Sequence, residues 1–244
     1  MKRTLATTVG LILAIVGPAS GQDKERPLKV FVLAGTSNML GAPAKIENLP
    51  EDLRQPLKDV LIHKGDWVPL EAGKTLVGNE ATFGLAMSRH LGEPIGILWV
   101  SAASTSKESP VGGIAKFVKQ AQDKGRPVAI AGMLADVSYF DGGKEETATA
   151  YGENLVRWVE ETRRLLGIAD LPIVMNRAIP PGQGRPLLEL VRKAQDAAKL
   201  PKFRVFDCDD VERGGDKVHF NTAGRLEMGK RFAAAMIELM KKDQ

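Results

Sequence analysis

Short apolar runs alternate with amphipathic stretches of helical length along most of the chain, and this alternation limits the possible folds more than any other feature. Strands that are apolar throughout are typical of a parallel sheet covered by helices on both faces. We therefore predict an α/β fold, a three-layer α/β/α sandwich with a mainly parallel sheet of about five strands. The expected strands are residues 28–34, 95–100, 127–134, 171–175 and 203–206, and the expected helices are residues 82–91, 114–123, 145–166, 186–198 and 222–242.

Residues 28–244 are expected to form one domain, because no internal repeat, low-complexity tract or interdomain linker interrupts them. Residues 60–69 fit a small hairpin that turns at Lys64-Gly65, which we interpret as an insertion rather than a core element. Asn221 is the expected N-cap of the last helix. Open α/β sheets place their functional sites in loops at the carboxyl ends of the strands, so these loops are searched first.

The first 21 residues have the order of a secretory signal peptide. Lys2 and Arg3 precede an apolar run at residues 11–16, and small residues lead up to Gly21. Cleavage after Gly21 would leave residues 22–27 as a flexible, charged start of the mature chain. The apolar run is too short to span a bilayer, and an uncleaved N-terminal anchor is the alternative. The protein is thus predicted to be exported, periplasmic or extracellular, with no stable membrane span after cleavage.

Charge and cysteine content narrow the range of partners and of covalent links. The formal net charge is +4, and no dense Lys/Arg block with interleaved aromatic residues occurs, so we expect no nucleic-acid partner. Cys208 is the single cysteine of the chain, which leaves no pair for an intrachain disulfide. It follows an apolar strand and is expected to be a small buried residue rather than a nucleophile.

Ser37 lies just after the first expected strand, within the segment Gly35-Thr-Ser-Asn-Met-Leu-Gly41. Gly35 permits an unusual backbone conformation, and N–H groups around Ser37 could point at an anion. The segment differs from the G-x-S-x-G elbow of α/β-hydrolases. On spacing alone, Ser37 is either a turn or cap residue or a nucleophile at the carboxyl end of the sheet.

A second candidate segment, Asp216-Lys-Val-His-Phe-Asn221, precedes the last helix. An aspartate three residues before a histidine can hold Nδ1 of the imidazole, which leaves Nε2 free to take a proton from a hydroxyl group. The chain has three histidines, and His219 alone has a carboxylate three residues before it, whereas His63 lies in the expected hairpin and His90 lies within a helical pattern. The alternative is that Asp216 merely supports the start of the helix.

Taken together, the two segments resemble the SGNH/GDSL hydrolases. Residues 31–41 are similar to the start of the sialate O-acetylesterase and acetylxylan esterase branch. Residues 78–84 resemble the Gly-Pro-Glu-x-x-Phe-Gly stretch of that branch, and residues 216–224 fit its C-terminal block. The resemblance covers residues 28–240 and implies the flavodoxin-like sandwich of SGNH hydrolases.

The resemblance also implies a chemistry and a role for each residue. Ser37 would be the nucleophile, His219 the base and Asp216 the acid that orients it. The implied reaction removes acetyl groups from sugar hydroxyls, so the expected partner is an acetylated carbohydrate, and neither a metal nor an organic cofactor is expected.

Two central blocks depart from the pattern of the branch. Thr36 stands where members carry Gln, and Ala102 or Ala103 stands where a Gly-Gly segment supplies a backbone N–H to the oxyanion. After the third strand, Val137 and Ser138 are expected at the place of a Gln-Gly pair whose Gln side chain donates to the oxyanion. Losing one such donor costs about 2.7–4 kcal/mol of transition-state stabilisation. The residues expected to hold the oxyanion or the substrate are Gly35, Thr36, Asn38, Ala102, Ala103 and Ser138.

Three hypotheses remain from the sequence. The first is an exported serine esterase that removes O-acetyl groups from carbohydrate, and the second is a catalytically impaired relative that binds glycans. The third is a lipid or thioester hydrolase, because a fold does not fix the acyl chain. For the first we expect His219 Nε2 within hydrogen-bond reach of the Ser37 hydroxyl, with Asp216 on the other ring nitrogen. A His219 ring that faces away would contradict the triad.

Overall fold

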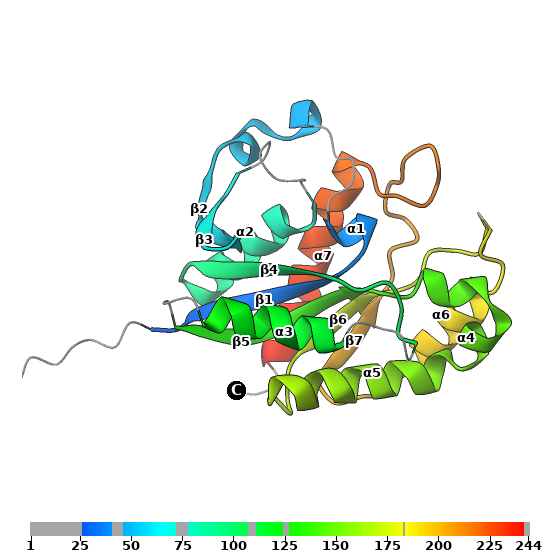
Figure 1. The fold of residues 1–244 in the computed structure, drawn as a ribbon. Helices are drawn as coiled ribbons and strands as arrows, with labels where there is room; N and C mark the ends of the chain where they lie inside the picture. The colour runs from blue at the N-terminus through cyan, green and yellow to red at the C-terminus, as the bar shows by residue number, and fades with distance from the viewer. Residues whose placement is uncertain are drawn as a thin grey trace, which may run out of the picture.

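The apolar runs of the sequence form one central, twisted sheet (Figure 1). The computed structural model describes residues 26–40, 46–71, 78–106, 111–123, 127–182 and 184–241. In this part of the chain the sheet has seven strands in the order β3-β2-β4-β1-β5-β6-β7. The strands are β1 (Leu28–Gly35), β2 (Leu57–His63), β3 (Trp67–Leu70), β4 (Ile95–Ser101), β5 (Val128–Asp136), β6 (Ile173–Asn176) and β7 (Phe203–Phe206).

All neighbouring strands are parallel except β3, which runs antiparallel to β2. The central strand β1 lies between β4 and β5, and its last residue, Gly35, pairs with Ser101 of β4 and with Asp136 of β5. Because parallel strands end at the same edge of a sheet, the loops after β1, β4 and β5 meet there. This edge is where the candidate site is built.

The hairpin at residues 60–69 corrects one expectation. It is β2 and β3, and it belongs to the sheet, because β2 pairs in parallel with β4 at Val60, Leu61 and Ile62. The sheet therefore has seven strands instead of about five. In β2, the successive residues Lys58 and Asp59 are both exposed, so the strand lacks the apolar pattern of a central strand. Its pairing with β4 uses backbone groups that a sequence pattern does not reveal.

Helices cover both faces of the sheet, which confirms the three-layer α/β/α sandwich (Figure 1). One face carries α3 (Val111–Gln122), α5 (Tyr151–Leu166) and α6 (Leu188–Ala197), and the other carries α2 (Glu80–Leu91) and α7 (Thr222–Lys241). The expected helix at 145–166 is divided at Ala150 into α4 (Glu145–Thr149) and α5. The short elements are α1 (Ser37–Leu40) and the 3-10 turns η1 (Ile46–Asn48), η2 (Glu51–Arg54) and η3 (Phe140–Gly143).

Each face of the sheet has its own apolar core. Trp158 and Tyr151 of α5 are buried beneath one face, and Phe83 of α2 and Phe232 of α7 are buried against the other. Helices α2 and α7 approach closely at Gly229, where an added Cβ would lie 2.2 Å from Thr82 Oγ1. Any larger residue at this position would push the two helices apart.

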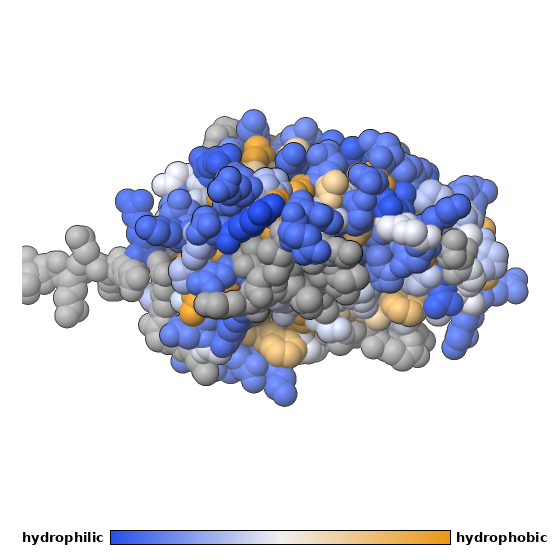
Figure 2. All heavy atoms as spheres, turned by 90° about the horizontal axis from the view of Figure 1, so that it is seen from above, coloured by the Kyte–Doolittle hydropathy of each residue, from blue (hydrophilic) through white to orange (hydrophobic). Residues whose placement is uncertain are grey.

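Several smaller expectations can be compared with the structure. Asn221 caps α7, because its Oδ1 accepts the N–H of Gly224 at 2.9 Å. Cys208 is buried, as expected. None of the described helices is long and apolar enough to cross a membrane. The predicted signal peptide, residues 1–21, lies outside the described residues. The face of the molecule in Figure 2 is mostly hydrophilic with small, separate hydrophobic areas.

Candidate active site

Ser37 lies at the carboxyl edge of the sheet, two residues beyond the end of the central strand β1 and at the first position of α1. Gly35 makes this turn possible. A Cβ at Gly35 would lie 2.6 Å from Cβ of Met39 and 3.0 Å from the carbonyl oxygen of Asp136, so a side chain cannot fit between α1 and β5. The glycine therefore lets α1 fold back tightly, which presents Ser37 at the edge.

The three residues of the expected triad are joined by hydrogen bonds. The Ser37 hydroxyl oxygen lies 2.7 Å from Nε2 of His219, and Nδ1 of the same ring lies 2.6 Å from Oδ2 of Asp216. The distances agree with the expected geometry and contradict the alternative in which His219 faces away. The arrangement can move a proton from the hydroxyl to the imidazole while the carboxylate stabilises the resulting positive charge.

The loop before α7 fixes the orientation of Asp216. Its Oδ1 accepts the backbone N–H groups of Val218 and His219, each at 2.9 Å, while Lys217 between them has a positive φ of 57°. The hydrogen bond from the His219 ring, together with these N–H groups, lowers the pKa of Asp216 to about 2. The carboxylate is thus ionised over the whole range in which an imidazole changes its charge.

Two side chains tie the His219 loop to the Ser37 segment. Nδ2 of Asn38 donates to the carbonyl of Val218 at 3.2 Å, and Oδ1 of Asn38 accepts the N–H of Phe220 at 3.1 Å. The guanidinium of Arg225, fully buried in α7, donates to the carbonyl oxygens of Ser37 and Phe220 at 3.2 and 3.0 Å. Asn38 was expected to bind substrate, whereas Arg225 was not predicted as a site residue.

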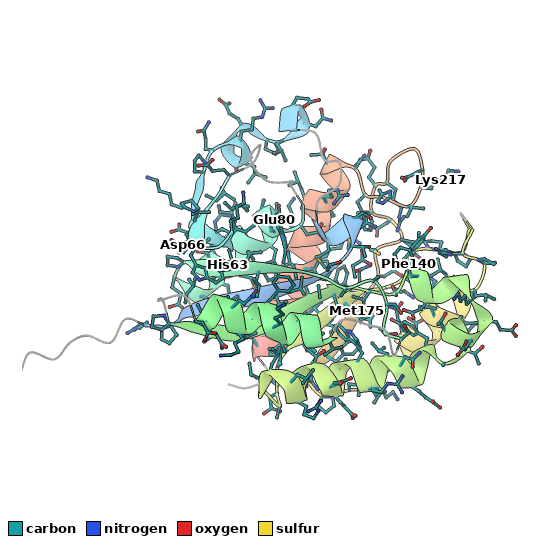
Figure 3. All side chains as sticks on the ribbon, in the orientation of Figure 1. His63, Asp66, Glu80, Phe140, Met175 and Lys217 are labelled. Carbon is teal, nitrogen blue, oxygen red and sulfur yellow. The ribbon has the colours of Figure 1, made fainter. Side chains whose placement is uncertain are left out.

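The segment at residues 78–80, in front of α2, supports Asn38 from the other side. Nδ2 of Asn79 lies 3.4 Å from the carbonyl oxygen of Asn38. The side chain of Glu80, labelled in Figure 3, is buried, and its Oε1 accepts the N–H of Gly78 at 2.7 Å. Burial raises the pKa of Glu80 to about 7, and the nearby positive charge of Arg225 reduces this effect. Residues 78–84 thus hold the serine segment and do not line the cavity.

A cavity of about 320 Å³ opens at the triad. In Figure 3, Phe140 lies on the same side of the molecule as Lys217, which follows the cavity-lining residue Asp216. Phe140 is 45% exposed and packs edge-on against Tyr139, so the two rings form an apolar wall. The cavity is lined by Thr36, Ser37, Asn38, Asp136, Ser138, Tyr139, Phe140, Ile179, Asp216, Val218 and His219.

Only some of the residues expected to hold the oxyanion or the substrate line the cavity. Thr36, Asn38 and Ser138 line the cavity, whereas Gly35, Ala102 and Ala103 are not among its lining residues. The N–H of Ala102 donates to the carbonyl of Gly35 at 3.0 Å, so it is engaged within the sheet edge. Ser138 is 1% exposed, and its position at the cavity keeps it a candidate donor.

The end of β5 differs from what the sequence analysis assumed. Val137, expected opposite Ser37, is fully buried in the core on the α3–α5 side and is absent from the cavity wall. Asp136, one residue earlier, lines the cavity instead, because successive side chains of a strand point to opposite faces. The side chain that the end of β5 presents to the cavity is therefore an acid rather than a valine.

Asp136 lies in an unusual environment for a carboxylic acid. Nδ2 of Asn176, at the end of β6, lies 3.4 Å from Oδ1 of Asp136. Burial raises the pKa of Asp136, and the Asn176 hydrogen bond and the positive charges of Arg225 and His219 only partly offset this. The sequence analysis did not list Asp136 as a site residue.

Other candidate groups lie away from this cavity. His63 and Asp66 are at the opposite end of the molecule from Lys217 and Phe140 (Figure 3). Trp99 and His63 line a separate hollow. Burial raises the pKa of the Cys208 thiol to about 12, which suits an inert core residue. Within the described residues, no group of three His, Cys, Asp or Glu side chains is placed to hold a metal ion.

Comparison with known proteins assigns the chain to a family. Residues 27–238 match the family described as carbohydrate esterase, sialic acid-specific acetylesterase. The chain belongs to this family. A probable carbohydrate esterase of Arabidopsis thaliana is 25% identical over 258 residues, which cover 89% of this chain and 95% of that protein.

Several solved structures have the same fold as this protein. The structure of an Arabidopsis thaliana protein matches with a TM-score of 0.74 and 21% identity, over 87% of this chain and 98% of that one. A carbohydrate acetylesterase of Xanthomonas citri matches with a TM-score of 0.66 and 16% identity, over 88% of this chain and 57% of that one. The resemblance to SGNH-type carbohydrate esterases is thereby confirmed at the level of family and fold.

Proposed function

We propose that the protein is an exported serine esterase that removes O-acetyl groups from carbohydrate. The observation that carries the proposal is the hydrogen-bonded chain from Ser37 through His219 to Asp216 at the mouth of the cavity. A serine that only caps a helix or supports a turn does not require a hydrogen bond to an imidazole that an ionised carboxylate orients. Membership of a carbohydrate esterase family supports an acetylated sugar as substrate.

The proposed first half-reaction acetylates Ser37. The imidazole Nε2 of His219 takes the hydroxyl proton as the serine oxygen attacks the acetyl carbonyl carbon, and Asp216 stabilises the imidazolium. The carbonyl electron pair moves onto the oxygen and returns as the bond to the sugar oxygen breaks. The imidazolium then protonates the departing sugar hydroxyl, which leaves an acetyl ester on Ser37.

In the second half-reaction, water takes the place of the sugar. His219 removes a proton from the water as its oxygen attacks the acetyl ester, and then returns that proton to Ser37, so acetate leaves and the enzyme is restored. The wall of Tyr139 and Phe140 is suited to pack against a sugar ring, since aromatic rings offer flat apolar faces.

Export is part of the proposal and rests on the composition of residues 1–21. Expression of the full chain in a bacterium, followed by cell fractionation and N-terminal sequencing, tests it. We expect a mature chain that starts at Gln22 outside the cytoplasm. An intact Met1 terminus in the cytoplasmic fraction would contradict export and leave the catalytic proposal standing.

The activity itself is tested with residues 22–244, assayed for acetate release beside Ser37→Ala. Substrates are p-nitrophenyl acetate, acetylated xylan and an O-acetylated sialic acid. We expect release that disappears in the variant. Equal release by both proteins, or none from either while circular dichroism shows the fold intact, would contradict the esterase proposal and favour a glycan-binding protein.

A further inference from the structure

Asp136 lies at the carboxyl end of β5 and lines the cavity, but it has no role in the proton transfer between Ser37 and His219. Asp136 pairs with Gly35 across the β1–β5 ladder, only two residues from Ser37 along the chain. It lines the cavity together with Ser37 and His219. A carboxyl group is thus placed in the same cavity as the atoms that would react.

An ionised carboxylate at this place would oppose the reaction. Attack by Ser37 puts negative charge on the carbonyl oxygen of the ester, and a second negative charge in the same partly enclosed cavity would repel it. A protonated carboxylic acid has the opposite effect, because its O–H group is a hydrogen-bond donor. The protonation state of Asp136 therefore decides whether the cavity favours or opposes the transition state.

The surroundings of Asp136 favour the protonated form. Its Oδ1 has a single long hydrogen bond, from Asn176, and no partner for Oδ2 is found among the described residues. Asp141 nearby is fully buried and accepts hydrogen bonds from the Ser104 hydroxyl and the Thr105 N–H at 2.7 and 3.0 Å, whereas Asp136 is partly buried at the cavity. Asp136 lacks such donors and retains one oxygen for a ligand.

The charged and titratable groups around Asp136 come from several elements. Arg225 of α7 and His219 of the preceding loop lower the pKa of Asp136 when they are positive, but by less than burial raises it. Tyr151 of α5 and Cys208 after β7 also sense the charge of Asp136, and both have raised pKa values and stay neutral at physiological pH. Deprotonation of His219, which the base role requires, removes one of the two opposing positive charges.

We propose that Asp136, as a neutral carboxylic acid, donates a hydrogen bond to the acyl oxygen of the ester bound at Ser37. This inference rests on the esterase function proposed above. The O–H bond of Asp136 stays intact throughout, and the proton that moves is the one passed between Ser37, His219 and the leaving sugar oxygen. The acid thus serves as an oxyanion donor in place of the one that Val137 cannot supply, and its donation ends when it ionises.

The pH dependence of the rate follows from the two groups. The active form has a neutral His219 and a protonated Asp136, so kcat/KM rises as the imidazole loses its proton and falls again as Asp136 ionises. Asp136→Asn keeps a donor of similar shape that cannot ionise. Asp136→Ala removes the donor.

The experiment measures kcat/KM for acetate release from pH 4.5 to 9 in the wild type, Asp136→Asn, Asp136→Ala and Ser37→Ala, with thermal unfolding as a check on folding. We expect Asp136→Asn to lose the alkaline decline and to exceed the wild type at pH 9 by about tenfold or more. Asp136→Ala should be about 10²-fold below Asp136→Asn. An alkaline decline that is the same in wild type and Asp136→Asn would overturn the inference.

A measurement without turnover tests the same point. The carboxyl ¹³C resonance of Asp136, assigned by its absence in Asp136→Asn, reports protonation directly. We expect the carboxyl group to ionise at a higher pH than an ordinary aspartate, whose pKa is about 3.9. Ionisation at or below the ordinary aspartate pKa would overturn the inference. If Ser37→Ala is inactive but the Asp136 variants keep the wild-type pH profile, the inference about Asp136 is wrong and the esterase proposal stands. If Ser37→Ala is still active, the proposed function is wrong.

Discussion

The side chain of Asn38 holds the backbone of Val218 although 180 residues separate them, with Nδ2 donating to the Val218 carbonyl at 3.2 Å. Oδ1 of the same amide accepts the N–H of Phe220 at 3.1 Å, so one side chain forms hydrogen bonds with the residues on both sides of His219. Asn38 follows Ser37 directly. The distance between the nucleophile and the base is therefore fixed by the residue next to the nucleophile.

Asn38→Ala should separate these two segments. The change leaves a backbone carbonyl and an N–H without partners, and each unsatisfied group costs about 1–3 kcal/mol when buried. We expect kcat for acetate release to fall by about 10- to 100-fold, because small displacements of reacting groups are costly. Steady-state kinetics and thermal unfolding would measure both effects. Activity within twofold of the wild type would show that Asn38 does not position His219.

Asp216→Asn removes the charge that stabilises the imidazolium and leaves the shape of the loop in place. We expect kcat to fall by about 10³- to 10⁴-fold with little change in KM, as in other triads. Because the pKa of Asp216 is about 2, the acid limb of the wild-type pH profile should not come from this carboxylate.

Asp210→Asn is the matched control for Asp216. Asp210 also has a pKa of about 2, but it is paired with Arg231 at 2.6 and 2.7 Å and does not line the cavity. We expect wild-type kinetics from this variant. A similar loss in both variants would mean that the effect of Asp216→Asn reflects surface charge and not the triad.

Glu80 should make the fold less stable as the pH rises. Its pKa is about 7 in the folded protein and about 4.5 in an unfolded chain, so the folded state binds the extra proton between these values. Stability from this group is full below pH 4.5 and decreases up to pH 7, by about 3 kcal/mol in total. Urea unfolding of Glu80→Gln against pH should lack this part of the slope.

The control for Glu80 is Glu47→Gln, since Glu47 is exposed in η1. It should keep the full pH dependence of the wild type. Asp136 contributes a slope of the same sign, which both variants retain. Identical slopes in the wild type and Glu80→Gln would show that Glu80 is ionised in the folded protein at neutral pH.

Phe140 should affect the binding of the sugar and not the rate of ester hydrolysis. Phe140→Ala removes an exposed ring from the cavity wall, and we expect KM for acetylated xylan to rise about tenfold while hydrolysis of p-nitrophenyl acetate changes little. Phe117→Ala is the control, because Phe117 is similarly exposed at 47% but lines the separate hollow near His63. Equal effects of both changes on KM would exclude a specific sugar contact at Phe140.

The three layers of the fold and the Asp216–His219 pair could be predicted from the sequence, because the patterns that indicate them lie within short segments. Apolar runs and helical periodicity identify the three layers, and Asp216 and His219 lie close enough in sequence to suggest a pair. The prediction that β2 and β3 are an insertion outside the sheet was wrong, because strand pairing depends on backbone groups.

The middle of the site could not be predicted, since it depends on which side chain of a strand end turns toward the cavity. A shift of one residue exchanges Val137 for Asp136, an apolar side chain for an acid. Arg225 was missed for a related reason, because its partners are backbone carbonyls of Ser37 and Phe220 that leave no mark in the sequence.

The central claim is that Ser37 is the nucleophile, and covalent trapping tests it most directly. The mature chain would be treated with a fluorophosphonate, which reacts with activated serines, and the labelled peptide identified by mass spectrometry. The account predicts a single label on Ser37, lost in Ser37→Ala and strongly reduced in His219→Ala. Label on Ser138 or another serine, or no label on a protein that still releases acetate, would contradict it.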